Sequence, residues 1–112
     1  MTQRPFGIEA KVYRLGKDYV FHVTGGVAHI GAVATAYQVE GEVKVELVTV
    51  PGHREDELAV EFATLACRKC NNTVTAIVGI HIHQATKKQI ETAVLSAREA
   101  VEEVLSKIHD IV

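Results

Sequence analysis

The sequence predicts an α+β fold, a two-layer sandwich in which two helices cover one face of a mixed, mostly antiparallel five-stranded sheet (β-β-β-β-α-β-α). Three observations lead to this prediction. The first half of the chain alternates apolar and polar residues with the period of two that strands show. Two later segments carry apolar residues at the spacing of amphipathic helices, and a β-branched run separates them. We expect residues 1–112 to form a single domain.

Four strands in two hairpins are predicted for the first half of the chain, at residues 7–15, 18–24, 32–39 and 42–50. Glu40-Gly41 supplies the turn of the second hairpin. The last strand alternates charged side chains with valine and leucine, so we expect one of its faces to be in water.

The first helix is predicted over residues 56–70, where an acidic cluster suits the positive end of the helix dipole. Asn71-Asn72 is expected to close it. Its expected buried stripe is Leu58, Phe62, Leu65 and Ala66.

The chain after this helix predicts a strand and a second helix. Residues 73–82 form a nearly unbroken β-branched run, which is typical of a central strand. The second helix is predicted over 87–109, and Thr86 and Gln89 form a capping box at its start. Its expected stripe is Ile90, Ala93, Val94, Ala97, Val101, Val104, Leu105 and Ile108.

The arrangement of these elements predicts an assembly. Strand 42–50, helix 56–70 and strand 73–82 should make a right-handed parallel crossover. With both helices on one face, the other sheet face carries Val, Thr and Tyr side chains. Covering that face with a second copy is the simplest way to bury it, so we expect a homo-oligomer.

Composition excludes several classes of protein. The chain has 12 basic and 14 acidic residues, scattered along it, which argues against binding to nucleic acid. No apolar run reaches the ~20 residues of a membrane span, and the first residues lack the apolar stretch of a signal peptide. We therefore expect a cytoplasmic protein with no membrane partner.

Histidine is the residue type most suggestive of chemistry, with six in the chain. His81 and His83 form an H-x-H pair on the predicted central strand, a spacing at which two rings can share a metal ion. His53 is the third ligand that we assign, with His29 or Glu55 as alternatives. In the competing interpretation these rings only hydrogen-bond backbone groups at the end of the sheet.

Two segments are candidate anion sites. Residues 25–31 contain three glycines, so the backbone N–H groups can converge on an anion, although a flexible loop is the simpler interpretation. The second helix begins at Thr86-Lys87, where free N–H groups, a hydroxyl and a cation could bind a phosphate. The alternative interpretation is an ordinary capping box followed by a lysine in water. The turn at residues 52–54 is expected at the opposite strand end, so that only a subunit interface would join it to this helix start.

Cys67-x-x-Cys70 is predicted to be structural. It lies at a helix C-terminus, where the dipole raises a thiol pKa, and no second C-x-x-C completes a zinc site. One thiol is expected on the apolar side. The sequence shows no recognisable Ser-His-Asp or Cys-His nucleophile set, so no catalytic residue is assigned.

Three ordered motifs, at residues 25–31, 51–56 and 79–90, resemble the prenylated flavin chaperone family, the LpdD-like small subunits that accompany gallate-type decarboxylases. The likeness spans about residues 20–95. It departs from the family's pattern at His83-Gln84, where an acidic or amide residue is more usual.

The resemblance implies a non-catalytic protein that binds prenylated FMN, or FMN, and protects it or delivers it to a UbiD-type decarboxylase. The implied cofactor-binding residues are Gly25, Gly26, His29, His53, Arg54, His81, Thr86 and Lys87. Arg54 with the glycine backbone, or Thr86-Lys87, would hold the phosphate. The histidines would lie at the flavin ring or hold a divalent metal. Two alternatives stay open: a small histidine-based metal-dependent enzyme, and a structural subunit that docks onto a larger decarboxylase.

Overall fold

The computed structural model describes the backbone of residues 4–111 and the side chains of residues 4–108. Its elements are η1 (Pro5–Gly7), β1 (Glu9–Leu15), β2 (Asp18–Gly26), β3 (Ala32–Val39), β4 (Glu42–Thr49), α1 (Asp56–Cys70), β5 (Val74–His81) and α2 (Lys87–Ile111). Apart from the short 3₁₀ turn η1, this is the predicted element order. The α+β prediction is therefore confirmed.

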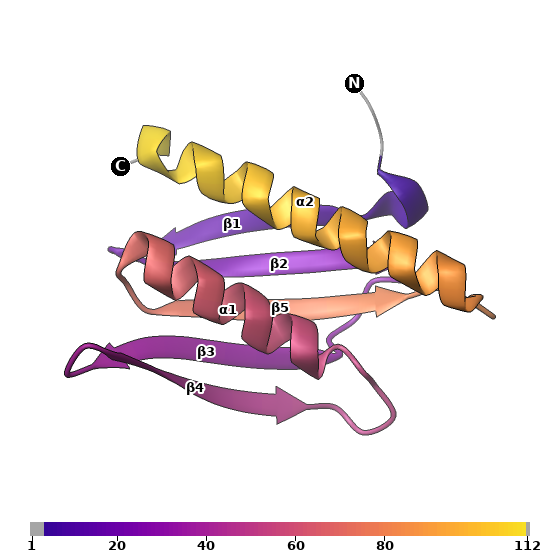
Figure 1. Cartoon of the computed structure of the whole chain (residues 1–112), viewed down its shortest axis with the longest axis horizontal. Coiled ribbons are helices and arrows are strands. Elements are labelled where there is room, and N and C mark those ends of the chain that lie inside the picture. Colours follow the sequence, from indigo (N-terminus) through magenta and orange to yellow (C-terminus); the bar gives the residue numbers. More distant parts are fainter. Residues whose placement is uncertain (1–3, 112) are drawn as a thin grey trace.

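Within residues 4–111 the strands form one sheet in the order β1-β2-β5-β3-β4, with β5 in its centre as predicted. β2 and β5 pair in parallel, and the other three pairings are antiparallel. Since β4 and β5 are both antiparallel to β3, they run in the same direction, and the predicted parallel crossover through α1 is present (Figure 1). β3 lies between its two strands.

Three strands consequently end at the same place. β2, β4 and β5 all run the same way, and their last residues are Gly26, Thr49 and His81. We call this part of the molecule the carboxyl end of the sheet.

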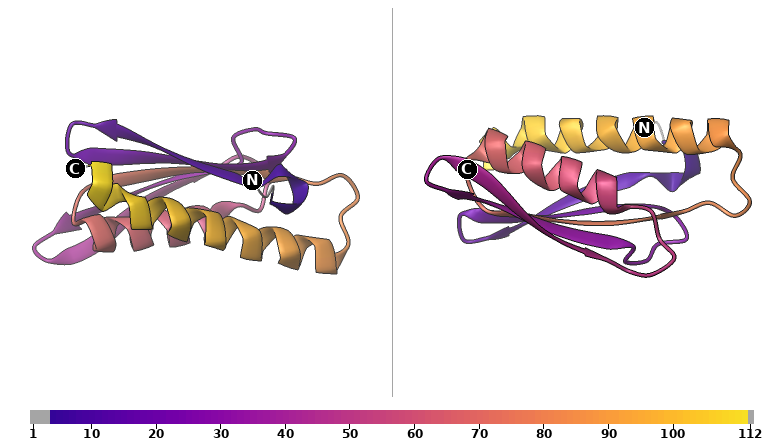
Figure 2. Two further views of the ribbon diagram at one scale, coloured as in Figure 1. Left: turned by 90° about the horizontal axis from the view of Figure 1, so that it is seen from above. Right: turned by 60° about the horizontal axis from the view of Figure 1, so that its bottom comes forward.

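Both helices lie on the same side of the sheet (Figure 2). Small residues set the distance of α1, because alanines of β3 are buried against alanines of the helix. The buried residues of α1 are Ala59, Phe62, Ala63, Ala66 and Cys67. The predicted stripe was wrong at Leu65, which is 39% exposed, because the alanine side of the helix packs against the sheet.

α2 buries most of its predicted stripe. Ala93, Ala97, Val101 and Leu105 are all in the core. Ile90 is instead 52% exposed, because the first turn of α2 extends past the carboxyl end of the sheet. The predicted capping box is confirmed: the Thr86 N–H donates to Oε1 of Gln89 at 2.9 Å, and the Gln89 N–H donates to Oγ1 of Thr86 at 3.1 Å.

The opposite face of the sheet carries half-buried Val, Thr and Tyr side chains, as expected, together with Ile77. Val33 and Ile77 are neighbours across the β3–β5 pairing, and the Thr35 and Thr75 hydroxyls hydrogen-bond at 2.7 Å. The expectation that a second copy covers this face stays a prediction. No helix in the described part of the chain is long and apolar enough to cross a membrane.

Candidate functional site

The three sequence motifs meet at the carboxyl end of the sheet. The loop after β2 (residues 27–31), the loop after β4 (50–55) and the loop after β5 (82–86) each leave one of its three strands (Figure 1). The expectation that the second and third motifs lie at opposite strand ends was wrong, because β4 and β5 are parallel. One chain therefore brings all three together without a subunit interface.

The β2–β3 loop is held down on β5. The Val27 N–H donates to the His81 carbonyl at 3.0 Å, and the Gly31 N–H donates to a second β5 carbonyl at 2.9 Å. Between these anchors the backbone of His29 passes over Gly79, where a Cβ atom would lie 1.6 Å from the His29 carbonyl oxygen. Only glycine at this position lets the loop carry His29 against the sheet.

Gly25 and Gly26, the predicted anion cradle, are the last two residues of β2 and pair with Ile80 and His81. Close packing accounts for both glycines. A Cβ at Gly25 would lie 2.3 Å from the Ile8 side chain, and one at Gly26, whose φ is +64°, would lie 1.9 Å from the His81 carbonyl oxygen. Their role in holding an anion stays a prediction.

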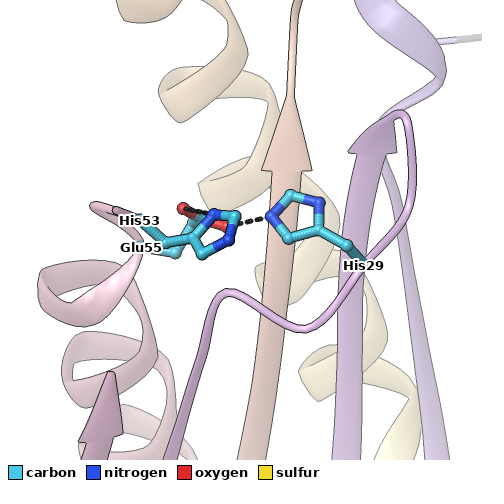
Figure 3. A group of neighbouring side chains, drawn as sticks. All are labelled: His29, His53 and Glu55. Carbon is cyan, nitrogen blue, oxygen red and sulfur yellow. Dashed lines mark hydrogen bonds and ion pairs between the residues drawn. The ribbon is translucent and has the colours of Figure 1, made fainter. Parts of the chain in front are cut away.

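His29, His53 and Glu55 form a cluster at this end of the sheet (Figure 3). Nε2 of His29 lies 2.7 Å from Oε2 of Glu55, and Nδ1 of His53 lies 3.9 Å from Oε1 of the same carboxylate. The two rings are tilted, with centroids 4.7 Å apart. His81 is close by, its ring centroid 6.3 Å from that of His29. The histidines from all three motifs are thus neighbours.

Glu55 is the centre of this cluster and was not among the predicted cofactor-binding residues. It occupies the N-cap position of α1, without a capping hydrogen bond from its side chain, and is only 7% exposed. Its Oε1 accepts a hydrogen bond from the Arg54 N–H at 3.0 Å, and it packs on Gly31, where a Cβ would lie 1.8 Å from Oε2. A carboxylate at a helix N-terminus is favoured by the helix dipole. The sequence does show an acidic residue at the start of the helix, but it gives no indication that this residue is buried.

His29 has an oxygen at each ring nitrogen. Nδ1 lies 2.9 Å from the Val27 carbonyl oxygen, and Nε2 lies against the Glu55 carboxylate. A ring with one hydrogen can donate to only one of these acceptors. Because a carbonyl oxygen only accepts, Nδ1 is the ring nitrogen that donates to Val27, and Nε2 faces the Glu55 carboxylate.

The predicted metal ligands are not those that the structure gathers. β5 ends at His81, and His83 lies in the following turn, so the strand alternation that would align the two rings stops too early. Among the described residues, the group with ligand atoms close enough for one ion is His29, His53 and Glu55, whose ligand atoms all lie within 4.8 Å of one another. It shares His53 with the expected set of His53, His81 and His83, and its other two members are the alternatives that the sequence offered for the third ligand.

A cavity of about 360 Å³ opens beside the cluster, between the start of α1, the end of β5 and the start of α2. Its polar lining comes from Arg54, Glu55 and His81. Its apolar lining is Leu58, Ile80, Ile82, Ala85, Ile90, Ala93 and Val94. Thr86 and Lys87 follow directly after Ala85, so the predicted phosphate seat borders the same cavity.

The sequence matches the family model described as the prenylated flavin chaperone LpdD-like domain over residues 2–109. The chain belongs to this LpdD-like family. The resemblance carried by the three motifs is thereby confirmed, and it extends over nearly the whole chain. No curated protein sequence matches this one.

The cavity of this LpdD-like chain suits a flavin in size and chemistry. Its volume lies within the range of about 300–1,000 Å³ that is usual for small-molecule sites, which combine apolar walls with a few polar groups. Apolar side chains from β5 and α2 supply a wall for an aromatic ring, and Arg54 supplies a cation for a phosphate. The residues present therefore fit prenylated flavin as a cargo.

The two cysteines of the LpdD-like chain lie away from this cavity, in the last turn of α1. Cys67 is fully buried in the core, which confirms the prediction of one thiol on the apolar side, and Cys70 is half-buried. Burial raises the pKa of both thiols. A raised thiol pKa lowers the thiolate fraction at neutral pH, the opposite of what a redox motif requires.

Proposed function

We propose that the chain binds prenylated FMN in the cavity at the carboxyl end of the sheet and passes it to a UbiD-type decarboxylase without turning over a substrate. The observation that carries the proposal is the position of the cavity. It lies where the three family motifs meet, and its walls are apolar with Arg54, Glu55 and His81 as the polar members. The chemistry of decarboxylation would be supplied by the cofactor in the enzyme that receives it.

The lining residues divide the work of binding. Ile80, Ile82 and Val94 exclude water from one side of a bound ring, which protects a reduced flavin from solvent. His81 and the His29–Glu55 pair offer polar atoms to the heteroatoms of the ring edge.

The phosphate has two proposed seats, both next to this wall. One is the guanidinium of Arg54, which pairs well with phosphate. The other is the start of α2 at Thr86-Lys87, where backbone N–H groups and the helix dipole favour an anion.

The binding test is an anaerobic titration of the purified chain with reduced prenylated FMN, followed by absorbance and fluorescence. We expect saturable binding, with Arg54→Gln weakening it by roughly 10- to 150-fold because a charged hydrogen bond contributes about 1.5–3 kcal/mol. Arg68→Gln is the matched control: Arg68 is exposed near the other end of α1. If Arg68→Gln weakens binding by about tenfold or more while neither Arg54→Gln nor Lys87→Gln does, the assignment of the cavity is wrong.

Lys87→Gln distinguishes the two phosphate seats. If Arg54 holds the phosphate, Lys87→Gln leaves the affinity within about twofold, since an exposed charge that does not contact the phosphate contributes little. If the start of α2 holds it, the order of the two variants reverses. No spectral change with the unmodified chain would overturn the proposed function altogether.

Delivery is tested with an apo-decarboxylase of the UbiD type. The loaded chain is mixed with the apoenzyme under nitrogen, and decarboxylase activity is measured against an equal amount of free cofactor. We expect faster or fuller activation by the loaded chain, and no decarboxylation by the chain alone. Equal activation by free cofactor would contradict the delivery role while leaving the binding result intact.

A further inference from the structure

We propose that His29, His53 and Glu55 form a binding site for one divalent transition metal ion of the zinc type, opening toward the cavity. The three side chains come from two loops, and His29 and Glu55 are 26 positions apart in the sequence. Their ligand atoms nevertheless all lie within 4.8 Å of one another. Two imidazoles and a carboxylate are the ligands of many three-residue zinc sites.

The distances between ligand atoms suit this assignment. Metal–ligand bonds of about 2.0–2.2 Å at tetrahedral angles place two ligand atoms about 3.4 Å apart. In the structure Nε2 of His29 is 2.7 Å from Oε2 of Glu55, and Nδ1 of His53 is 3.9 Å from Oε1. These two distances are within about 1 Å of the tetrahedral spacing. The ligand atoms all lie within 4.8 Å of one another, so the longest separation must shorten by at most about 1.4 Å, which side-chain rotation provides.

Two of the three ligands are already oriented by second partners. The hydrogen bond of His29 Nδ1 with the Val27 carbonyl leaves the lone pair of Nε2 pointing at Glu55. The Arg54 N–H holds the other oxygen of Glu55. A backbone carbonyl behind a ligating histidine is the usual support of a metal site, because it fixes the tautomer and the ring orientation.

Burial gives the second reason. Nε2 of His29 and Oε2 of Glu55 lie 2.7 Å apart, and Glu55 is too buried for water to separate them. A metal ion between these two atoms would bind both, with His53 as a third ligand.

The side chains also indicate which ions bind and what remains open. Imidazole and carboxylate groups are common ligands of Zn²⁺. The affinity of such a site usually rises from Co²⁺ through Ni²⁺ to Cu²⁺, and Zn²⁺ binds less tightly than Cu²⁺. Three protein ligands leave a fourth coordination position for water or an anion. Because Glu55 also lines the cavity, that position would face an anionic ligand bound there.

The experiment is a Zn²⁺ titration of the untagged, metal-free chain without flavin, followed by calorimetry. We expect one Zn²⁺ per chain, and His53→Ala should weaken binding at least tenfold. His22→Ala is the matched control, since His22 lies in β2 and pairs with Lys11 in β1 away from the cluster. Titration with Co²⁺ should give the visible absorption of a tetrahedral site.

A second variant guards against a folding artefact. Glu55→Gln keeps the shape of the side chain and removes its charge, and circular dichroism checks that each variant remains folded. Equal Zn²⁺ affinity of the unmodified chain and His53→Ala would overturn the proposal, as would loss of binding in His22→Ala. Because no flavin is present, failure here leaves the proposed flavin binding untouched, and failure of the flavin titration leaves this site untouched.

Discussion

Replacing Gly31 by alanine tests how Glu55 is held in the candidate site. A Cβ at this position would lie 1.8 Å from Oε2 and 2.3 Å from Cδ of Glu55, both far inside van der Waals contact. Gly31 is not among the glycines with positive φ, so alanine is compatible with its backbone. The whole penalty should therefore come from pushing the carboxylate away from His29.

The size of the effect follows from the interactions that are lost. A hydrogen bond to a charged group contributes about 1.5–3 kcal/mol. Alanine in place of glycine returns about 0.4–1 kcal/mol by restricting the unfolded chain. The net loss in the free energy of unfolding is roughly 0.5–2.5 kcal/mol. With an unfolding entropy of about 2.1 cal/mol/K per residue, the melting temperature should fall by about 2–10 °C.

The assay is thermal unfolding by circular dichroism at one protein concentration, for Gly31→Ala in the unmodified chain and in a Glu55→Ala background. The three atoms closest to the new methyl group all belong to the Glu55 carboxylate, so the Glu55→Ala background removes the clash. Only the effect of alanine on the unfolded chain then remains. Gly31→Ala should therefore destabilise the first protein and stabilise the second by about 0.4–1 kcal/mol. Equal destabilisation in both backgrounds would refute the reasoning.

Three further predictions concern other parts of the molecule. Thr86→Ala removes the capping box of α2 and should lower the unfolding free energy by about 1 kcal/mol in urea titrations, whereas Thr86→Ser should not; equal losses would contradict the cap. Because burial raises the pKa of both thiols, iodoacetamide should modify the folded chain slowly at pH 8, and buried Cys67 more slowly than half-buried Cys70. Peptide mapping checks this, with the urea-unfolded chain as control. If a second copy covers the open sheet face, Ile77→Lys should reduce the mass measured by light scattering to that of one chain with little loss of helix signal; an unchanged mass would rule out this interface.

Local patterns were sufficient for the elements themselves. The strand predicted at 32–39 and the helix predicted at 56–70 have the bounds of β3 and α1, because hairpin turns and helix caps are encoded by neighbouring residues. The β-branched run at 73–82 was correctly identified as the central strand β5.

Packing between elements was harder to predict. The stripe of α1 was misjudged at Leu65 because hydrophobicity alone favours leucine for the interior. The helix instead turns its alanines to β3, whose own alanines permit a close approach. Complementary size across two segments, which a single helical pattern does not reveal, decided that contact.

The sequence by itself determined the order of the elements, the turns and caps that bound them, and the presence of three histidine-bearing motifs, because each of these depends on residues a few positions apart. Only the tertiary structure decided that β2, β4 and β5 run in the same direction and so carry His29, His53 and His81 to one end of the sheet. It also decided that Glu55 is buried among them. The direction of a strand depends on which distant strand it pairs with, and that choice is made by the core as a whole.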